Sequence, residues 1–479
     1  MRIKSLHIKD YRILKDFDID FSSNLSVLIG ENGSGKSSVL ECLAYIFGHL
    51  HKYFVLDDKT AEFIDGYRIN YEINGYDVFI ESKYVYSETN TFRPIIRINN
   101  EEISLSQIKN RFGGFRRFLP DKTILSYSGI TERFKDLNKH FEDKFIKKII
   151  RNNNPYSLTP LKLPEDNPFL YVKKEYVSFV LLSLFVLDSE ESKAILRTIG
   201  IDINGCTTTI TIKKPYWAKS DKQKKENGNL WGIEGKIALN FLEGLNMVGL
   251  RKQDDDEQMN APKKLVYELY GSLMVYDLFH SYFNLRPDQV VSFMDTLLCD
   301  DLLGGVNITW GDGISVDFLS EGEKQLILSV GLGLVMENRN LLFLFDEPDV
   351  SLHPKWQQEF IPNMMKGLDD ESMAIIATHS PILVGNLHKS FVQIIQKGKM
   401  IPRENYYSFG RDINSILEDY FNTEERSKDG KRLIQEFYDA MNKKDYDTSE
   451  VLLNKLIELF GPSDVATVKA NSLFDDLAE

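Results

Sequence analysis

The sequence predicts an α/β fold whose core is split in two by an inserted unit. Residues 1–30 alternate as strands do and lead through a glycine-rich turn into apolar residues at helical spacing. Helical spacing then prevails from about Thr131 to Asp301, and alternation of strands and helices returns only after residue 305. A chain of 479 residues also exceeds what one compact core normally holds, so two or three units are expected.

The first lobe is expected to span residues 1–130. The stretches RIKSLHI, FDIDF and NLSVLIG predict three strands, and SSVLECLAYIFGHL predicts the helix that follows the glycine-rich turn. The stretches RINYEI, YDVFIESKYVY and PIIRIN then predict further strands. Because these three are short and follow one another closely, we expect them to form an antiparallel addition to the lobe.

The inserted unit, residues 131–305, is expected to be mainly helical. Apolar residues at helical spacing predict long helices over Phe134–Ile150 and Lys264–Phe283. The polar run KSDKQKKENGN, Lys219–Asn229, predicts a loop.

A second α/β lobe is expected over residues 306–410 and a helical tail over residues 411–479. The lobe is predicted by ITWGDGISVDF, by the apolar runs LLFLF and MAIIAT, and by helices starting at Glu321 and after Pro354. The tail keeps helical spacing through Phe460 and ends in SLFDDLAE. Two interpretations of the tail stay open: packing on the chain's own core, or docking of Leu473, Phe474 and Leu477 in a basic, apolar groove of a partner.

Composition indicates a cytosolic protein. The chain is 42% apolar and 27% charged, which is an ordinary globular balance, and its three cysteines form no CxxC pair. No signal peptide is visible, and no apolar run reaches the roughly 20 residues of a membrane span. With a net charge of −13, any contact with DNA or RNA needs a local basic patch. Arg111–Arg117 and Lys144–Arg151 are candidates, although solvated helix faces are the simpler interpretation.

The glycine-rich turn fits the phosphate-binding pattern G-x-x-x-x-G-K-[ST]. It reads GENGSGKS from Gly30 to Ser37, follows a predicted strand and opens a predicted helix, as the pattern requires. Glycines let backbone N–H groups approach phosphates, Lys36 can neutralise the β- and γ-phosphates, and Ser37 can reach Mg²⁺. The turn therefore predicts a site for ATP and Mg²⁺.

Two further strand ends supply polar side chains. Asp346 ends the run LLFLF, where a carboxylate can hold hydrated Mg²⁺, and Glu347 can deprotonate an attacking water. His379 follows the predicted strand IIAT and is expected near the γ-phosphate. Taken alone, an acidic pair is an ordinary strand end and a single histidine is usually structural, so the phosphate pattern decides both interpretations.

A second helix start, in LSEGEKQ, also offers N–H groups to an anion. Ser320 and Glu323 form the pattern of a capping box, which by itself indicates only a well-made helix start. Gly322 weakens a helix, and the capping box gives no reason for it.

These motifs, in the order P-loop, LSEGEKQ, FLFDEPDVSLHP and ATHSP, resemble the ATP-binding-cassette superfamily. The stretches KDYRIL and LHP are similar to its soluble SMC/RecF/OLD branch. The resemblance implies an ABC-type ATPase head in which Ser320 and Gly322 are signature residues, Ser351 is the D-loop serine, His379 is the switch histidine and Arg12 lies near the nucleotide. The residues that it implies for ATP are Arg12, Gly30, Glu31, Asn32, Gly33, Ser34, Gly35, Lys36, Ser37, Ser38, Ser320, Gly322, Glu323 and Ser351. The resemblance also implies that Ser37 and Asp346 bind Mg²⁺ and that Glu347, His379 and Lys36 are catalytic.

The resemblance also implies how the second helix start is used. In this superfamily the signature glycine approaches the ATP of a facing subunit, so two chains would clamp two ATP molecules head to tail, in a dimer or a larger assembly. One departure is the region LSYSGITERF, Leu125–Phe134, where the usual Q-loop glutamine is missing.

The tail stretch YSFGRDINSILEDYF and the stretch LPDKTILSYSG resemble ATPases of bacterial antiphage defence cassettes of the Septu and retron-associated types. This resemblance implies a sensor or scaffold that controls a separate nuclease, HNH-type in the first interpretation. No nuclease of the chain's own is expected, because the acidic cluster of OLD nucleases is not seen after His379. The alternative is a RecF-like DNA-repair clamp without a toxic partner, and a transporter ATPase is a distant third.

Overall fold

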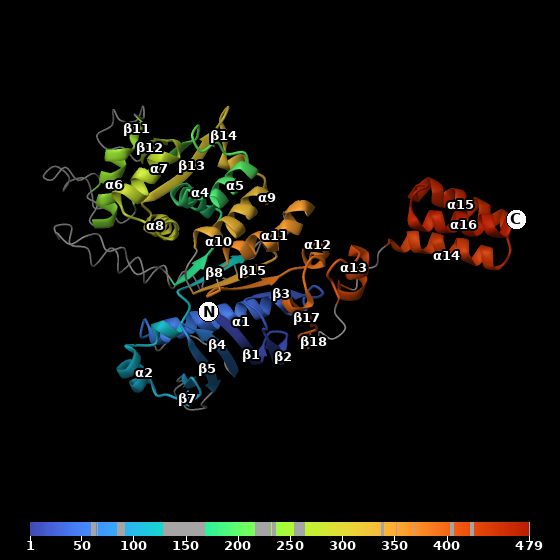
Figure 1. Ribbon diagram of the computed structural model, residues 1–479, viewed down its shortest axis with the longest axis horizontal. Coiled ribbons are helices and arrows are strands. Elements are labelled where there is room, and N and C mark those ends of the chain that lie inside the picture. Colours follow the sequence, from blue (N-terminus) through green and yellow to red (C-terminus); the bar gives the residue numbers. More distant parts are fainter. Residues whose placement is uncertain are drawn as a thin grey trace. The chain divides into compact units, whose positions relative to one another are not determined.

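The computed structural model describes residues 1–58, 64, 66–83, 92–127, 168–215, 231, 236–252, 264–336, 340–350, 352–368, 370–402, 407–421 and 426–478. The chain divides into two compact units, residues 1–410 and 411–479 (Figure 1). The division of the first unit into residues 1–130, 131–305 and 306–410 stays a prediction. The predicted helix Phe134–Ile150, the loop Lys219–Asn229 and the basic stretch Lys144–Arg151 lie outside the described residues.

A seven-stranded mixed sheet forms the centre of the first unit, and both ends of residues 1–410 contribute to it. Its strands, in spatial order, are β18 (Lys399–Ile401), β17 (Val392–Gln396), β3 (Leu25–Ile29), β16 (Met373–Ala377), β15 (Leu341–Asp346), β8 (Lys122–Tyr127) and β9 (Phe169–Tyr171). All neighbours are parallel except β17 and β18. The residues of β3, β15 and β16 are all buried, as expected for parallel strands covered on both faces.

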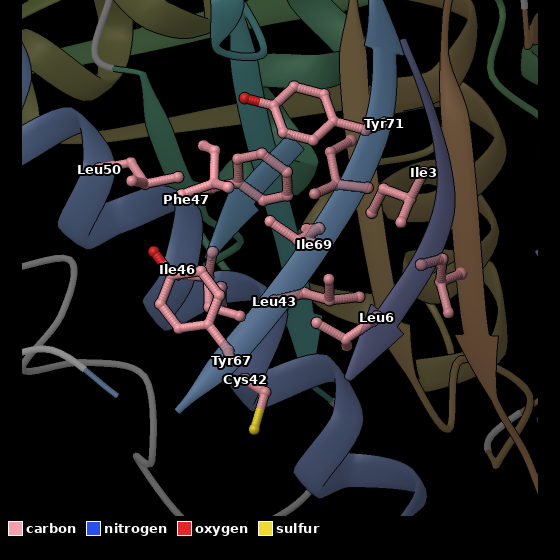
Figure 2. Close-up of a cluster of buried hydrophobic side chains, with 14 of the residues drawn as sticks. Ile3, Leu6, Cys42, Leu43, Ile46, Phe47, Leu50, Tyr67, Ile69 and Tyr71 are labelled. Atoms are coloured by element: carbon pink, nitrogen blue, oxygen red, sulfur yellow. The ribbon is translucent and has the colours of Figure 1, made fainter. Parts of the chain in front are cut away.

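An antiparallel sheet of six strands lies next to this centre. It has the order β2 (Leu14–Asp20), β1 (Arg2–Tyr11), β4 (Tyr67–Ile73), β5 (Tyr76–Lys83), β6 (Arg93–Ile98) and β7 (Glu101–Glu102). These strands confirm the predicted antiparallel addition. Helix α1 (Lys36–Phe54) packs between the two sheets, and Figure 2 shows Leu43, Phe47 and Leu50 of α1 against Ile69 and Tyr71 of β4. These apolar contacts fix the direction of α1, and therefore the place of the loop that precedes it.

The inserted region and the stretch ITWGDGISVDF, which was expected in the second lobe, together form a sheet that the sequence did not predict. Five antiparallel strands have the order β11 (Leu250–Lys252), β12 (Lys264–Tyr270), β10 (Thr207–Lys213), β13 (Leu303–Trp310) and β14 (Ile314–Ser315). The expectation of a mainly helical insertion is therefore incomplete. The single helix predicted over Lys264–Phe283 is wrong, because β12 ends at Tyr270 and the helical part starts at Gly271, where φ is +68°.

Helices of the same region pack against this sheet and against the second lobe. They are α4 (Tyr176–Leu187), α5 (Glu190–Thr198), α6 (Lys236–Val248), α7 (Gly271–Tyr276), the π-helical turn η5 (Asp277–Tyr282) and α8 (Pro287–Cys299). Helix α4 packs on the π-helical segment η7 (Ile327–Gly331). A Cβ atom at Gly331 would lie 3.0 Å from Cγ1 of Val180, so the glycine permits this close approach.

The helices of the second lobe cover the face of the seven-stranded sheet opposite α1 (Figure 1). Helix α9 (Glu321–Leu326) continues through η7 into α10 (Leu332–Val335). Helix α11 (Pro354–Gly367) packs against η7 and α10. Shorter elements are α2 (Leu105–Phe112), η1 (Arg116–Phe118), η6 (Val316–Phe318), α12 (Pro381–Gly385) and η8 (Lys389–Phe391). The split two-lobe α/β architecture of an ABC-type ATPase head, expected from the sequence, is confirmed.

The second unit is helical, as predicted for residues 411–479. It contains α13 (Ile413–Phe421), α14 (Lys428–Asn442), α15 (Tyr446–Phe460) and α16 (Val465–Ala478). Helices α14, α15 and α16 share a core that includes Phe437 and Leu456. Leu473 and Phe474 are partly buried against this core, which favours the interpretation of the tail as packing on the chain itself. Within the described part of the chain, no helix combines the length and the apolar character that crossing a bilayer needs.

Candidate nucleotide site

The predicted site residues meet at the carboxyl ends of three neighbouring strands. Strands β3, β16 and β15 are adjacent and parallel, so the loops that leave their carboxyl ends share one edge of the sheet. These loops carry Lys36, His379 and Glu347. Nζ of Lys36 lies 2.6 Å from Nε2 of His379, and that nitrogen lies 3.5 Å from Oε1 of Glu347. Segments separated by more than 300 residues thus form one polar cluster.

The loop between β3 and α1 requires its glycines. Gly30 has φ +144°, and a Cβ atom there would lie 2.0 Å from the carbonyl oxygen of Ile395. Gly35 has φ +115°, and its Cβ atom would lie 2.8 Å from Cδ2 of Leu14. Gly35 also caps α1 without a side-chain hydrogen bond, so no side chain of the cap residue satisfies the first N–H groups of this helix. Such a helix start suits an anion.

Lys36 lies folded back into this loop and is only 4% exposed. Its ammonium group donates to the carbonyl oxygens of Gly30 (3.0 Å) and Glu31 (3.1 Å), and also to His379. Burial lowers the pKa of Lys36 to about 8, although the nearby carboxylates of Glu347 and Asp346 act in the opposite direction. The same loop holds Ser34, whose buried Oγ has no hydrogen-bond partner among the described residues. A phosphate in the loop would give Ser34 a partner and would offer Lys36 an anionic acceptor in place of the carbonyl oxygens.

His379 is a neutral imidazole in this arrangement. Burial, with the charge of Lys36 as a second cause, lowers its pKa to about 4. An ammonium group can only donate, so Nε2 accepts from Lys36 and the ring proton sits on Nδ1. The contact between Nε2 and Glu347 is therefore not an ion pair at neutral pH.

Ser37 and Asp346 fit a magnesium ion. Oγ of Ser37 donates to Oδ1 of Asp346 at 3.1 Å, so a hydroxyl and a carboxylate, both hard oxygen ligands, lie side by side. Asp346 is 2% exposed, and burial raises its pKa to about 6. Mg²⁺ typically takes one or two carboxylates in addition to phosphate oxygens and water, which matches this donor set.

At Glu347 the backbone changes direction and leaves the end of strand β15. Its φ is +52°, an uncommon conformation for a residue with a side chain, and its N–H donates to the carbonyl oxygen of Ala377 at 2.8 Å. This hydrogen bond holds the backbone, while the carboxylate stays 40% exposed. A partly exposed carboxylate beside the cluster is suited to accept a proton from water.

Arg12 lies on the neighbouring turn between β1 and β2. Its guanidinium pairs with Glu41 at 2.9 Å, and Glu41, which is 1% exposed, stands one turn after Ser37 on α1. Cγ2 of the adjacent Ile13 lies 3.2 Å from the position of a Cβ atom on Gly35. Arg12 is thus beside the glycine-rich loop. The remaining residues of the predicted set on that loop and the first turn of α1 are Asn32, Gly33 and Ser38.

The second predicted phosphate-binding helix start is elsewhere. Ser320 accepts from N of Glu323 at 3.3 Å, and Glu323 accepts from N of Ser320 at 2.8 Å, which confirms the capping box. Ser320 is exposed and Gly322 is buried. Among the described residues, no hydrogen bond or ion pair joins this helix start to the glycine-rich loop. Ser351 and most of the Q-loop region Leu125–Phe134 lie outside the described residues.

The described basic candidate Arg111–Arg117 is used locally. Arg111 pairs with Glu101, Arg116 donates to the carbonyl oxygens of Pro120 and Asp121, and Arg117 stacks on Tyr76. These contacts favour the interpretation as ordinary structural side chains over a nucleic-acid patch.

Sequence reasoning overlooked four polar residues around the cluster. They are Glu41 on α1, Asp349 after Glu347, Thr378 before His379, and Gln357 on α11. The signal for Glu41 was its spacing of four from Ser37, which places both on one face of α1. Thr378 and Asp349 stood inside stretches that had already been singled out.

Known proteins give a consistent picture. The family model described as "AAA ATPase domain" matches residues 1–384. The retron Ec83 probable ATPase of Escherichia coli is 21% identical over 519 aligned residues, which cover 98% of this chain and 86% of that protein. The retron Vc95 probable ATPase of Vibrio cholerae is 23% identical over 83% of this chain and 74% of its own length. The DNA replication and repair protein RecF of Desulfitobacterium hafniense is 29% identical over 31% of this chain and 40% of its own length.

Solved structures are only loosely similar. A RecF structure with ATP has a TM-score of 0.35 at 13% identity and covers 84% of this chain and 97% of that one. The SMC head domain of Thermotoga maritima has a TM-score of 0.32 at 14% identity, with 84% and 99% covered. The family model, in contrast, covers most of the chain, which therefore belongs to the AAA ATPase domain family.

Proposed function

We propose that this chain is an ATP-hydrolysing switch that controls a separate nuclease in a bacterial antiphage cassette of the retron type. The observation that carries the ATPase part is the convergence of Lys36, Ser37, Asp346, Glu347 and His379 at one edge of the seven-stranded sheet. Support for the cassette comes from the likeness to two retron ATPases, one of them along 98% of the chain.

Each residue of this cluster has a separate role in the proposed hydrolysis of ATP. Ser37 and Asp346 would hold Mg²⁺, which when bound offsets the charge of the phosphates. Lys36 leaves the carbonyl oxygens of Gly30 and Glu31 and donates to the phosphates instead. Glu347 orients a water and takes its proton. When Lys36 turns to the phosphates, Nε2 of His379 loses its donor, so the neutral ring can carry its proton there and donate it to Glu347 or to the γ-phosphate.

The start of α9 contributes to the site of a second copy. Ser320 is exposed, and among the described residues no hydrogen bond joins it to the chain's own glycine-rich loop, which supports a phosphate contact with another molecule. Two large apolar side chains close to the motifs, Phe318 at 80% and Val350 at 63% exposure, also suit burial in an interface. A two-fold pair would then complete two composite sites.

The experiment compares Mg²⁺-dependent ATP hydrolysis by the wild-type chain and by Glu347→Gln. The substitution removes the base and leaves Lys36, Ser37 and Asp346 in place, so ATP should stay bound while turnover falls by about 100-fold or more. Near-wild-type turnover in Glu347→Gln would falsify the role of this residue. Failure of the wild-type chain to hydrolyse ATP would refute the ATPase assignment itself.

The nuclease is tested separately. The chain should co-purify with the product of an adjacent nuclease gene, HNH-type in our proposal, and cells carrying both genes should resist phage. A second candidate, a repair clamp without a toxic partner, is favoured by the 29% identity to RecF over 154 residues. It would gain support if the chain binds DNA ends or gaps and no neighbouring gene is needed for its cellular effect.

A further inference from the structure

A closed polar ring joins the two loops that carry Glu347 and His379. Oγ1 of Thr378 donates to Oδ1 of Asp349 at 2.6 Å and accepts from N of Ser380 at 2.9 Å. Oγ of Ser380 donates to Oε1 of Gln357 at 2.7 Å. Nε2 of Gln357 closes the ring by donating to the carbonyl oxygens of Asp349 (3.1 Å) and Leu352 (3.0 Å).

The polar ring brackets His379 on both sides. Thr378 and Ser380 are its immediate neighbours in the chain, and both are tied to the segment that begins two residues after Glu347. Glu347 itself is held independently, through the hydrogen bond from its N–H to Ala377. The ring therefore fixes the backbone of the histidine against the backbone that follows the carboxylate.

Three members of the ring are buried and Gln357 is half-buried, so most of these hydrogen bonds are shielded from water. Thr378 is 0%, Asp349 4% and Ser380 7% exposed. Removing one partner from such a network leaves a buried group unsatisfied, and the other members then move to find new partners. A buried carboxylate is also expensive where it only fills space, since an apolar side chain of similar size would pack there at lower cost. A polar network at this point has its clearest use in setting a fixed geometry.

We propose that Asp349 and Gln357 are positioning residues for ATP hydrolysis, which act by holding His379 in register with Glu347. The inference rests on the proposed ATPase function and deepens it. Neither side chain touches the Lys36, Ser37 and Asp346 cluster through any hydrogen bond found among the described residues. Loss of either should therefore lower kcat and leave the affinity for ATP nearly unchanged.

The test begins with two substitutions at one position. Asp349→Ala removes the acceptor of Thr378 and should lower kcat by about 10- to 100-fold, because small displacements of reacting groups have effects of this size. Asp349→Asn keeps an oxygen acceptor and should stay within about threefold of the wild type. Dissociation of a fluorescent ATP analogue, measured alongside, should change by less than about threefold in both variants.

A matched control separates positioning from general damage. Asp295 is a comparably buried carboxylate, 5% exposed, on α8, where it pairs with Lys173. Asp295→Ala should lower the thermal midpoint as much as Asp349→Ala does, while kcat stays near the wild-type value. Gln357→Glu, which keeps the acceptor for Ser380 and loses both donations, provides a second variant if Asp349→Ala does not fold, and it should also lower kcat.

A double substitution tests whether Asp349 affects kcat through His379. In a His379→Ala background, Asp349→Ala should cause no further loss of kcat, because the residue that the ring positions is already missing. An equal loss in both backgrounds would overturn the proposal, as would unchanged kcat in both Asp349→Ala and Gln357→Glu with an active wild-type chain. If the wild-type chain itself fails to hydrolyse ATP, the proposed function fails, and the positioning role fails with it.

Discussion

The starts of α1 and α9 are both proposed to meet an anion, and they differ in which groups remain available to bind it. At α1 the cap is Gly35, which gives no side chain to the N–H groups, and Lys36 and Ser37 follow at once. At α9 the cap is Ser320, whose hydroxyl already accepts from Glu323, and no cation of the glycine-rich loop is hydrogen-bonded to it among the described residues. The first therefore has the groups to bind phosphate by itself, while the second, under the proposed function, would add to a site made by another chain.

The most direct attempt to break this comparison uses inactive mixtures. Lys36→Ala disables the α1 start, and Ser320→Arg blocks the α9 start, so each variant alone should lose hydrolysis by about 100-fold or more. In a heterodimer one composite site carries both defects and the other carries none. Random exchange in an equal mixture gives half heterodimers, so about one quarter of the wild-type rate should return.

The mixture is informative only when the chains exchange. Exchange is followed with differently tagged variants that are pulled down together after mixing. A mixture that exchanges and regains no hydrolysis would show that the two helix starts do not share a site. A mixture of Lys36→Ala with Glu347→Gln serves as the control, because both substitutions lie at the α1 end. Each composite site of this heterodimer carries one of the two defects, so no hydrolysis should return.

Asp346 should reveal the energetic cost of the α1 site. Burial raises its pKa from 3.8 to about 6, so the folded chain binds this proton more tightly than the unfolded chain does. The charged carboxylate therefore destabilises the fold fully above about pH 6, and the penalty disappears as the pH falls below about 4. Asp346→Asn should raise the free energy of unfolding at pH 7.5 by up to about 3 kcal/mol, while abolishing Mg²⁺-dependent hydrolysis.

Urea unfolding without Mg²⁺ or nucleotide measures this effect at pH 7.5 and at pH 5. The gain in stability should shrink at pH 5, where the wild-type carboxyl group is mostly protonated. A loss of stability in Asp346→Asn at both pH values would mean that the hydrogen bond from Ser37 outweighs the cost of burial.

The pH dependence of kcat/KM sharpens the account of the α1 end. Asp346 must be ionised to hold a metal, so activity should fall as the pH drops through about 6. Lys36 must be protonated to bind phosphate, so activity should fall again as the pH rises through about 8. Outside this window the rate should change about tenfold per pH unit. His379, with a pKa of about 4, stays neutral across it.

Lys36→Arg assigns the alkaline limb of this profile. A guanidinium stays protonated well above pH 8, so whatever activity the variant keeps should no longer fall on that side. If the fall near pH 8 persists in Lys36→Arg, another group causes it.

The site was predictable to the extent that its residues stand in contiguous stretches at strand ends. The glycine-rich loop, Asp346, Glu347 and His379 each follow an apolar run that forms a buried parallel strand, and adjacent parallel strands bring their carboxyl ends together. The polar ring was not predictable in this way. Asp349 and Thr378 are 29 residues apart, and each is an unremarkable loop residue until the fold places them 2.6 Å from each other.

The five-stranded sheet was not predicted from the sequence for a different reason, which strand β12 illustrates. In Lys264–Tyr270 the buried residues Leu265, Tyr267 and Leu269 alternate with partly exposed ones, which is a strand pattern. The helical stretch that follows immediately gave the whole segment helical spacing. Gly271, at φ +68°, marks the boundary that the periodicity obscured.

The smallest expected effect separates the two uses of Ser320. The chain offers a matched control, since Ser104 caps α2 with the same capping box: it accepts from N of Gln107 at 3.3 Å, and its own N–H donates to Gln107 at 2.8 Å. Ser320→Ala and Ser104→Ala each remove one cap, so each should lower the free energy of unfolding by about 1 kcal/mol. Only Ser320→Ala should also lower ATP hydrolysis, because only this hydroxyl is proposed to reach a phosphate on a second chain. Equal losses of stability with unchanged hydrolysis in both variants would reduce the start of α9 to a well-capped helix, and the α1 site would then have to act without a partner's serine.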